Sequence, residues 1–236
     1  MYRDSVSSSR THVRLGTRFW SGHMRVQFNF RKKDLLMIKN IVFDIGKVLV
    51  RFDWEDYLAS FQFPEEETTA IAKAMFLSSN WNLVDEGRLS YEEIEQIFVD
   101  SCPAYADDIR LVFAHFGDCI TRFPYTRHWI SSLKQQGYQV YYLSNYGDFT
   151  CQYTRKDLDF CDLMDGGVMS YEVKCLKPDP AIYQSLFEKY HLKPEECVFI
   201  DDNAANIDAA KKLGMKTILF RDYFEARKQL NMLCNK

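Results

Sequence analysis

The segment IVFDIGKVLV, residues 41–50, places a carboxylate directly after an apolar run and two residues before a glycine. The run IKNIVF, residues 38–43, is typical of a buried strand, and Gly46 lets the backbone turn tightly behind it. A carboxylate at such a strand end can attack phosphorus and bind a metal ion. A lone aspartate there is more often a turn or helix cap, so a catalytic Asp44 requires partners from elsewhere in the chain.

Three more apolar runs follow along the chain. They are YQVYYLS (138–144), CVFI (197–200) and KTILF (216–220), and helical patterns separate them at 125–136, 178–190 and 204–213. This alternation predicts an α/β fold, with a Rossmann-like parallel sheet flanked by helices. Because ligands bind beyond the carboxyl ends of the strands in such sheets, residues that end different strands should converge.

Polar side chains stand at these strand ends and before one helix. Ser144 and Asn145 suit hydrogen bonding to phosphoryl oxygens. Lys177, in the segment CLKPDP, precedes a helix and can neutralise phosphate charge. Asp201 and Asp202 are adjacent carboxylates, which repel each other unless a cation or hydrogen bonds offset the repulsion. Taken singly, each of these residues also fits an ordinary turn, surface or cap role.

The order of these residues resembles the haloacid dehalogenase superfamily of hydrolases, over about residues 37–220. In this resemblance the four motifs of the superfamily fall on Asp44, Ser144, Lys177 and the pair Asp201 and Asp202. Within the superfamily, the segments FDIGKVLVRFDW, LSNYGD and FIDDNAANIDAA resemble the branch that contains bacterial α-glucose-1-phosphate phosphatase.

The resemblance implies an Mg²⁺-dependent phosphatase of a small phosphorylated metabolite, such as a sugar phosphate and in particular glucose 1-phosphate. Asp44 would form an aspartyl phosphate, which water then hydrolyses. The catalytic residues that it implies are Asp44, Lys177 and Ser144, and the substrate-binding residues are Ser144, Asn145 and Lys177. The metal ligands that it implies are Asp44, the backbone carbonyl of Gly46, Asp201 and Asp202, and such hard oxygen ligands suit Mg²⁺.

One position departs from the pattern of the superfamily's phosphatases. Many of them carry a second aspartate two residues after the nucleophile as general acid and base, and here Gly46 stands in that place. A missing general acid costs about 10²- to 10⁴-fold in rate, unless the leaving group departs readily or another residue substitutes. Gly46 therefore favours a sugar 1-phosphate, because the anomeric hydroxyl is unusually acidic. Asp53 is a candidate substitute acid, with a helix N-cap before Trp54 as the alternative.

Residues 54–123 lack any strand pattern and interrupt the predicted sheet. Apolar residues recur there at helical spacing in 66–76, 90–98 and 107–116. Ser90 followed by Glu93 is typical of a capping box. We therefore expect a small helical cap over 54–123, as in subclass I of the superfamily, and an α/β core formed by 37–53 and 124–236.

One loop of the expected cap could close over the cleft and exclude water. Trp81, Glu86 and Arg88 lie around Gly87 in this loop and are candidates for contact with the substrate. The alternative for Trp81 is a place in the core of the cap, since large aromatic residues are mostly buried.

Charge is distributed unevenly along the 236 residues. Residues 1–36 hold six Arg and two Lys against two acidic residues, a net charge of +6, so the other 200 residues carry −9 within a total of −3. We expect 1–36 to be a poorly ordered basic leader: an extension ahead of a start at Met37, an organellar presequence or an interaction arm. The acidic remainder offers no surface for nucleic acid or an anionic membrane.

Cysteine usage and hydropathy indicate the setting of the protein. The seven cysteines are scattered and form no CxxC pair, which is typical of free thiols in a cytoplasmic protein. No apolar stretch approaches the roughly 20 residues that a membrane helix requires. We expect a small-molecule phosphate ester as the partner, with no nucleic acid and no membrane, and a monomer or weak homodimer.

Two other functions stay open. A metal-independent haloacid dehalogenase also uses an aspartate nucleophile and lacks an acid two residues later, but it does not explain the adjacent Asp201 and Asp202. A non-catalytic phosphate-binding protein would explain Gly46, but not why Asp44 and Lys177 are both present.

Overall fold

Five parallel strands form the central sheet of the computed structural model, which describes residues 37–234. Their order across the sheet is β5, β4, β1, β6, β7. The bounds are β1 (Asn40–Phe43), β4 (Gln139–Ser144), β5 (Gly166–Met169), β6 (Cys197–Asp201) and β7 (Lys216–Leu219). The predicted parallel α/β fold is therefore confirmed, whereas the basic leader predicted for 1–36 lies outside the described residues.

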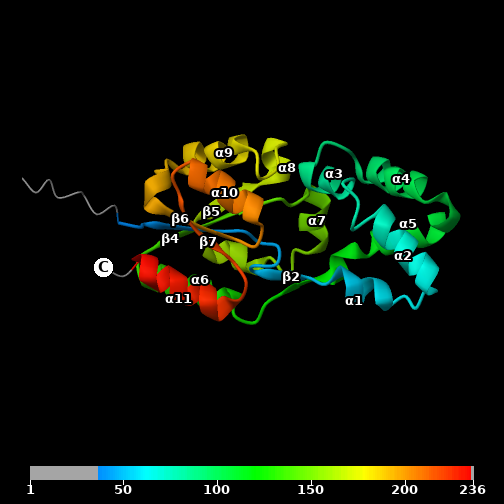
Figure 1. Cartoon of the computed structure of the whole chain (residues 1–236), viewed down its shortest axis with the longest axis horizontal. Helices are drawn as coiled ribbons and strands as arrows, with labels where there is room; N and C mark the ends of the chain where they lie inside the picture. Colours follow the sequence, from blue (N-terminus) through cyan, green and yellow to red (C-terminus); the bar gives the residue numbers. More distant parts are fainter. Residues whose placement is uncertain (1–36, 235–236) are drawn as a thin grey trace, which may run out of the picture. The chain divides into compact units, whose positions relative to one another are not determined.

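Helices cover both faces of this sheet (Figure 1). Ile41 and Phe43 of β1 pack with α6 (Thr126–Gln135) and α11 (Tyr223–Cys234). Val42, between them, points to the other face, where it packs with α9 (Pro180–Tyr190) and α10 (Ala204–Lys212). A strand buried on both faces explains why the β1 sequence is continuously apolar at these three positions. Burying each such side chain contributes about 1.5–3 kcal/mol.

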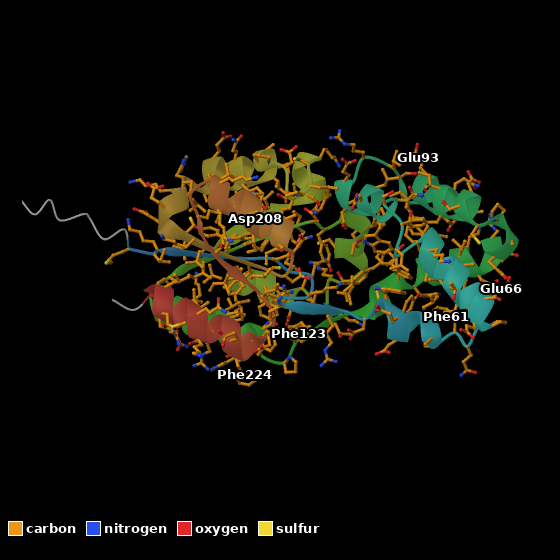
Figure 2. All side chains as sticks on the ribbon, in the orientation of Figure 1. Phe61, Glu66, Glu93, Phe123, Asp208 and Phe224 are labelled. Atoms are coloured by element: carbon orange, nitrogen blue, oxygen red, sulfur yellow. The ribbon has the colours of Figure 1, made fainter. Side chains whose placement is uncertain are left out.

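A second group of helices is inserted after β1. It comprises α1 (Trp54–Ala59), α2 (Glu65–Ala74), α3 (Trp81–Glu86), α4 (Tyr91–Ser101) and α5 (Ala106–Ala114), with the 3₁₀ helices η1 (Pro103–Tyr105) and η2 (Phe116–Cys119). These helices, here called the cap, enclose an apolar cluster to which Phe149, from outside the cap, also belongs. Exposed acidic residues such as Glu66 of α2 lie on the outside (Figure 2). The predicted capping box of Ser90 and Glu93 is confirmed. The division of the chain into separate cap and core domains stays a prediction.

Two short strands join the cap to the rest of the chain. β2 (Val50–Phe52) enters the cap and β3 (Ile120–Arg122) leaves it, and they pair in antiparallel fashion. The prediction that 54–123 contains no strand is therefore wrong at β3. With only three residues, β3 is too short for an alternating pattern to show in the sequence.

The edge strand β5 was also missed from the sequence, because it opens with two glycines, which are uncommon in strands. Both glycines are needed for close packing. A Cβ on Gly166 would lie 2.3 Å from the Tyr190 hydroxyl oxygen, and one on Gly167 would lie 2.3 Å from the Tyr142 ring. Gly167 thus permits tight packing against Tyr142, whereas Gly166 combines the contact with Tyr190 and a φ of +134°, which itself favours glycine.

The remaining elements connect the sheet strands. They are α7 (Asp148–Tyr153), α8 (Ser170–Val173), η3 (Asp159–Leu163) and η4 (Pro194–Glu196). All seven cysteines lie in the described part of the chain and are free thiols, as predicted. Among residues 37–234, no helix is both long and apolar enough to cross a membrane.

Candidate active site

The carboxyl ends of β1, β4 and β6 border a pocket of about 350 Å³. The core contributes mainly polar groups to its lining: Asp44, Gly46, Lys47, Asn145, Tyr146, Thr150, Lys177, Asp202, Asn203 and Asn206. The cap and the two connecting strands contribute Val50, Phe52, Trp81, Asp85 and Ile120. A polar floor of charged groups thus meets a largely apolar rim, as is usual for small-molecule sites.

Asp44 is held at the centre of this site through one of its two carboxylate oxygens. Oδ1 accepts hydrogen bonds from the Ile45 backbone N–H at 2.7 Å, from Ser144 Oγ at 2.7 Å and from Lys177 Nζ at 2.8 Å. Among the hydrogen bonds of residues 37–234, none reaches Oδ2. Oδ2 is therefore the oxygen left available for a reaction or for a metal ion.

Lys177 lies between two carboxylates. Its Nζ is 2.8 Å from Asp44 Oδ1 and 2.8 Å from Asp201 Oδ2, and the side chain is only 1% exposed. Asn145 holds the backbone of this lysine, since its side-chain oxygen accepts from the Lys177 N–H at 2.7 Å and its amide donates to the Lys177 carbonyl at 3.0 Å. The side chain of Asn145 is thus occupied by Lys177, and its backbone N–H donates no backbone hydrogen bond among the described residues.

Asp201 and Asp202 differ in their surroundings although they are adjacent. Asp201 is fully buried, and its oxygens accept from Lys177 Nζ, from the Asn203 N–H at 2.7 Å and from Asn206 Nδ2 at 3.0 and 3.1 Å. Asp202 is half-buried and lines the pocket. Asp201 therefore orients Lys177 from the buried side of the site, and Asp202 is the carboxylate of the pair that lines the pocket.

The three carboxylates fit a divalent cation. Asp44, Asp201 and Asp202 each offer one oxygen, and these oxygens all lie within 4.8 Å of one another. No backbone hydrogen bond among the described residues ends on the Gly46 carbonyl, which also borders the pocket. Carboxylate and carbonyl oxygens are the ligands that Mg²⁺ prefers. The sequence-predicted metal ligands are thus brought together, and Asp44, Gly46 and Asp202 line the pocket itself.

The pKa values of Asp44 and Asp202 are raised because these acids are buried close to other charges. Burial raises the pKa of Asp44 to about 7, with the Asp201 charge acting in the same direction and Lys177 opposing it. Burial and the Asp201 charge also raise the pKa of Asp202, while Lys47 and Lys177 lower it. Such raised pKa values in one pocket are typical of sites that bind a cation or transfer protons.

The predicted site residues that do not reach the pocket are equally informative. Ser144 is 1% exposed and its hydroxyl donates a hydrogen bond to Asp44. Its predicted contact with phosphate therefore stays a prediction. Asp53 does not line the pocket, and at the N-cap position of α1 its side chain makes no cap hydrogen bond. The predicted N-cap position of Asp53 is thus confirmed without a capping hydrogen bond, and the structure does not support its role as a substitute acid. Glu86 and Arg88 also lie outside the pocket lining, whereas Trp81 both lines the pocket and packs in the cap.

Several pocket residues were missed by sequence reasoning. Asp85 and Thr150 belong to no strand-end motif, and only the folded chain brings them into the same pocket lining as Asp44. Asn206 stands in the fourth motif segment, where the buried Asp201 needs donors, so this requirement was a signal that could have found it. Lys47, directly after Gly46, borders the pocket beside the acidic cluster.

A parallel α/β sheet, an aspartate paired with a buried lysine at its carboxyl edge, and a helical cap after the first strand define a class of hydrolases with an aspartate nucleophile. Residues 38–214 match the family described as haloacid dehalogenase-like hydrolase. The chain belongs to this family, as the sequence motifs predicted.

Related proteins show the range of chemistry in this family. D-ribitol-5-phosphate phosphatase of Bacteroides thetaiotaomicron is 27% identical over 212 residues, which is 84% of this chain and 100% of that protein. (S)-2-haloacid dehalogenase 4A of Burkholderia cepacia is 30% identical over 99 residues, or 42% of this chain and 43% of that enzyme. The narrower resemblance to α-glucose-1-phosphate phosphatase stays a prediction.

Similarity to solved structures supports the fold. A haloacid dehalogenase family enzyme from Bacteroides thetaiotaomicron, crystallised with magnesium and inorganic phosphate, superimposes with a TM-score of 0.62 at 22% identity. The match covers 80% of this chain and 98% of that one. At this identity the likeness establishes a common fold and leaves the reaction to be argued from the site.

Proposed function

We propose that this enzyme is an Mg²⁺-dependent phosphatase that hydrolyses a small phosphate ester through an aspartyl phosphate on Asp44. The observation that carries the proposal is the arrangement around Asp44. Its Oδ1 is fixed by three donors, Oδ2 is left without one among the described residues, and Asp202 borders the same pocket. An oriented carboxylate with one available oxygen suits nucleophilic attack on phosphorus.

The surrounding residues have separate tasks in this reaction. Lys177 and the Asn145 backbone N–H offer positive charge and a donor to the phosphoryl oxygens. Ser144 and the Ile45 N–H keep Asp44 in place. Asp44, the Gly46 carbonyl and Asp202 would hold Mg²⁺, with Asp201 behind them, and the bound ion would neutralise charge on the transferring phosphoryl group.

The pocket limits the size and character of the leaving group. A volume of about 350 Å³ lies near the lower end of the roughly 300–1,000 Å³ of small-molecule sites, so the pocket suits a leaving group of metabolite size. Thr150 is 3% exposed, borders the pocket, and has an Oγ1 with no hydrogen-bond partner in the described part of the chain. A substrate hydroxyl would satisfy it. These features support a sugar phosphate, and the sequence resemblance to α-glucose-1-phosphate phosphatase favours glucose 1-phosphate among them.

The dehalogenase alternative retains support from the Burkholderia relative and from Gly46. It leaves the clustered carboxylates unexplained, because a dehalogenase of this superfamily needs no metal. Without a cation, burial and the charge of Asp201 raise the pKa of both Asp44 and Asp202, with Lys177 opposing them in each case.

The proposal predicts turnover that depends on Mg²⁺. Phosphate release is measured from a panel containing glucose 1-phosphate, glucose 6-phosphate, ribitol 5-phosphate and p-nitrophenyl phosphate, before and after EDTA and again with Mg²⁺ restored. We expect EDTA to abolish release, Mg²⁺ to restore it, and glucose 1-phosphate to exceed glucose 6-phosphate in kcat/KM. Metal-independent halide release from 2-chloropropionate, without phosphate release from any ester, would establish the dehalogenase instead.

A further inference from the structure

The cap brings an acid to the site that lacks one at position 46. Asp85, in the last turn of α3, lines the same pocket as Asp44. Around it the cap side of the pocket is apolar, with Phe52, Trp81 and Ile120 in the lining. Among the pocket-lining residues, Asp85 is the carboxylate that comes from the cap.

The chain around Asp85 is attached to the core at several points. Ser170 Oγ donates to the Asp85 carbonyl at 2.5 Å, and the Lys174 ammonium donates to the carbonyl of Gly87. A Cβ on Gly147 would lie 2.3 Å from the Val84 carbonyl oxygen, so glycine permits close contact there. These contacts hold the cap loop in a defined place beside the pocket that Asp44 lines, and a catalytic group needs such a fixed position.

We propose that Asp85 is the general acid and base of this enzyme, in the place left open by Gly46. The inference rests on the phosphatase function proposed above. As an Asp44 oxygen bonds to phosphorus and the bond from phosphorus to the leaving oxygen breaks, the Asp85 carboxylic acid gives its proton to that oxygen, which departs as an alcohol.

The second half of the reaction returns the proton. The Asp85 carboxylate accepts a proton from a water molecule while the water oxygen bonds to phosphorus. The bond between phosphorus and Asp44 then breaks, which releases inorganic phosphate and the Asp44 carboxylate and leaves Asp85 protonated for the next cycle. Atoms and charges therefore balance over one hydrolysis.

The surroundings of Asp85 are consistent with this role. Burial raises the pKa of Asp85 to about 7, with the Asp44 charge acting in the same direction, while the Lys177 ammonium and the Gly147 backbone oppose them. The other charged groups that line the pocket are Lys47 and Asp202. A general acid is most effective when its pKa lies near the working pH.

The test compares esters whose leaving groups differ in acidity. In Asp85→Asn, we expect kcat/KM for glucose 6-phosphate and other alkyl phosphates to fall about 10²- to 10⁴-fold. p-Nitrophenyl phosphate should lose little, because its phenolate departs without a proton. Preference for glucose 1-phosphate over glucose 6-phosphate should therefore increase in the variant. Glu86→Gln changes the neighbouring carboxyl outside the pocket lining and should leave all of these values unchanged.

A rescue variant separates proton transfer from a structural role. A Cβ on Gly46 has no heavy atom within 4 Å, so the first side-chain atom of an aspartate meets no clash there. We expect Gly46→Asp, added to Asp85→Asn, to recover a large part of the lost alkyl phosphatase activity. If Asp85→Asn does not fold, the wild type still provides a test: an alkaline fall in kcat/KM for alkyl phosphates that p-nitrophenyl phosphate does not show.

Equal losses on alkyl and p-nitrophenyl esters, or no loss on either, would overturn the role of Asp85. So would an alkaline fall in the wild type that is the same for both classes of ester. A wild type that releases no phosphate from any ester would instead refute the phosphatase function itself, so the two failures are distinguishable.

Discussion

Replacing Asp44 by Asn should lower kcat on every phosphate ester by on the order of 10⁴- to 10⁶-fold, as expected when a nucleophile is removed. The amide is a poor nucleophile, and it also lacks the charge that a metal ligand needs. Steady-state phosphate release with saturating Mg²⁺ gives this value directly. The fold should survive, because the uncharged amide avoids the burial of a charge and the repulsion from Asp201, which together raise the pKa of Asp44 to about 7.

The matched control is Asp208→Asn. Asp208 is exposed on the outside of α10, which follows the fourth motif, and its carboxylate pairs with Lys211 at 3.5 Å (Figure 2). This variant makes the same chemical change away from the pocket and should keep wild-type kcat. Residual activity of a few per cent in Asp44→Asn would show that another group attacks phosphorus.

Lys177→Met should have the largest effect on stability. The lysine is 1% exposed and contacts a carboxylate oxygen of both Asp44 and Asp201 at 2.8 Å. Its removal leaves two buried acids without their cation, which costs about 3–5 kcal/mol in the free energy of unfolding. Urea unfolding at pH 7 in EDTA measures this loss without any contribution from metal binding.

The loss should also depend on pH, with a sign that follows from the raised pKa of Asp44. When a carboxyl has a higher pKa in the folded state than in the unfolded state, the free energy of unfolding falls as pH rises towards the folded pKa. Above the folded pKa, this group causes no further fall. In the wild type the folded-state pKa of Asp44 is about 7. Lys177 lowers the pKa of Asp44, so the variant must titrate at a higher pH. The free energy of unfolding of Lys177→Met should therefore fall further below that of the wild type as pH rises above about 7.

Lys228→Met is the control for this variant. Lys228 is 69% exposed and pairs with Glu225 at 3.9 Å, a surface arrangement worth at most about 1 kcal/mol. A loss in Lys177→Met no larger than in this control would contradict the buried arrangement. A deficit that shrinks at alkaline pH would contradict the sign argued for Asp44.

Much of the fold could be predicted because local sequence and tertiary structure agree in the core. The β1 segment is apolar on both faces, and the helix that follows Asp202 begins at an Asn203 cap, so periodicity and capping identify both elements. The convergence of Asp44, Lys177 and Asp202 also followed from one rule, since each stands at a strand end or before a helix of one parallel sheet.

The parts that could not be predicted depend on contacts between distant segments. Asp85 reaches the pocket because the Ser170, Lys174 and Gly147 regions attach the cap loop to the core, and no periodicity shows this. The use of the Asn145 side chain to hold Lys177 is likewise a contact across 32 positions. Strand-end chemistry is therefore readable from the sequence, whereas the contribution of the cap needs the structure.

Rapid-quench mass spectrometry tests the central claim most directly. Wild-type enzyme is mixed with Mg²⁺ and the ester from the panel that turns over fastest, quenched in acid within one turnover, digested and sequenced. The proposed mechanism predicts a phosphoryl group on the peptide that contains Asp44, formed and lost at rates compatible with kcat and absent without Mg²⁺. Phosphate release with no adduct, or with the adduct on another residue, would contradict it.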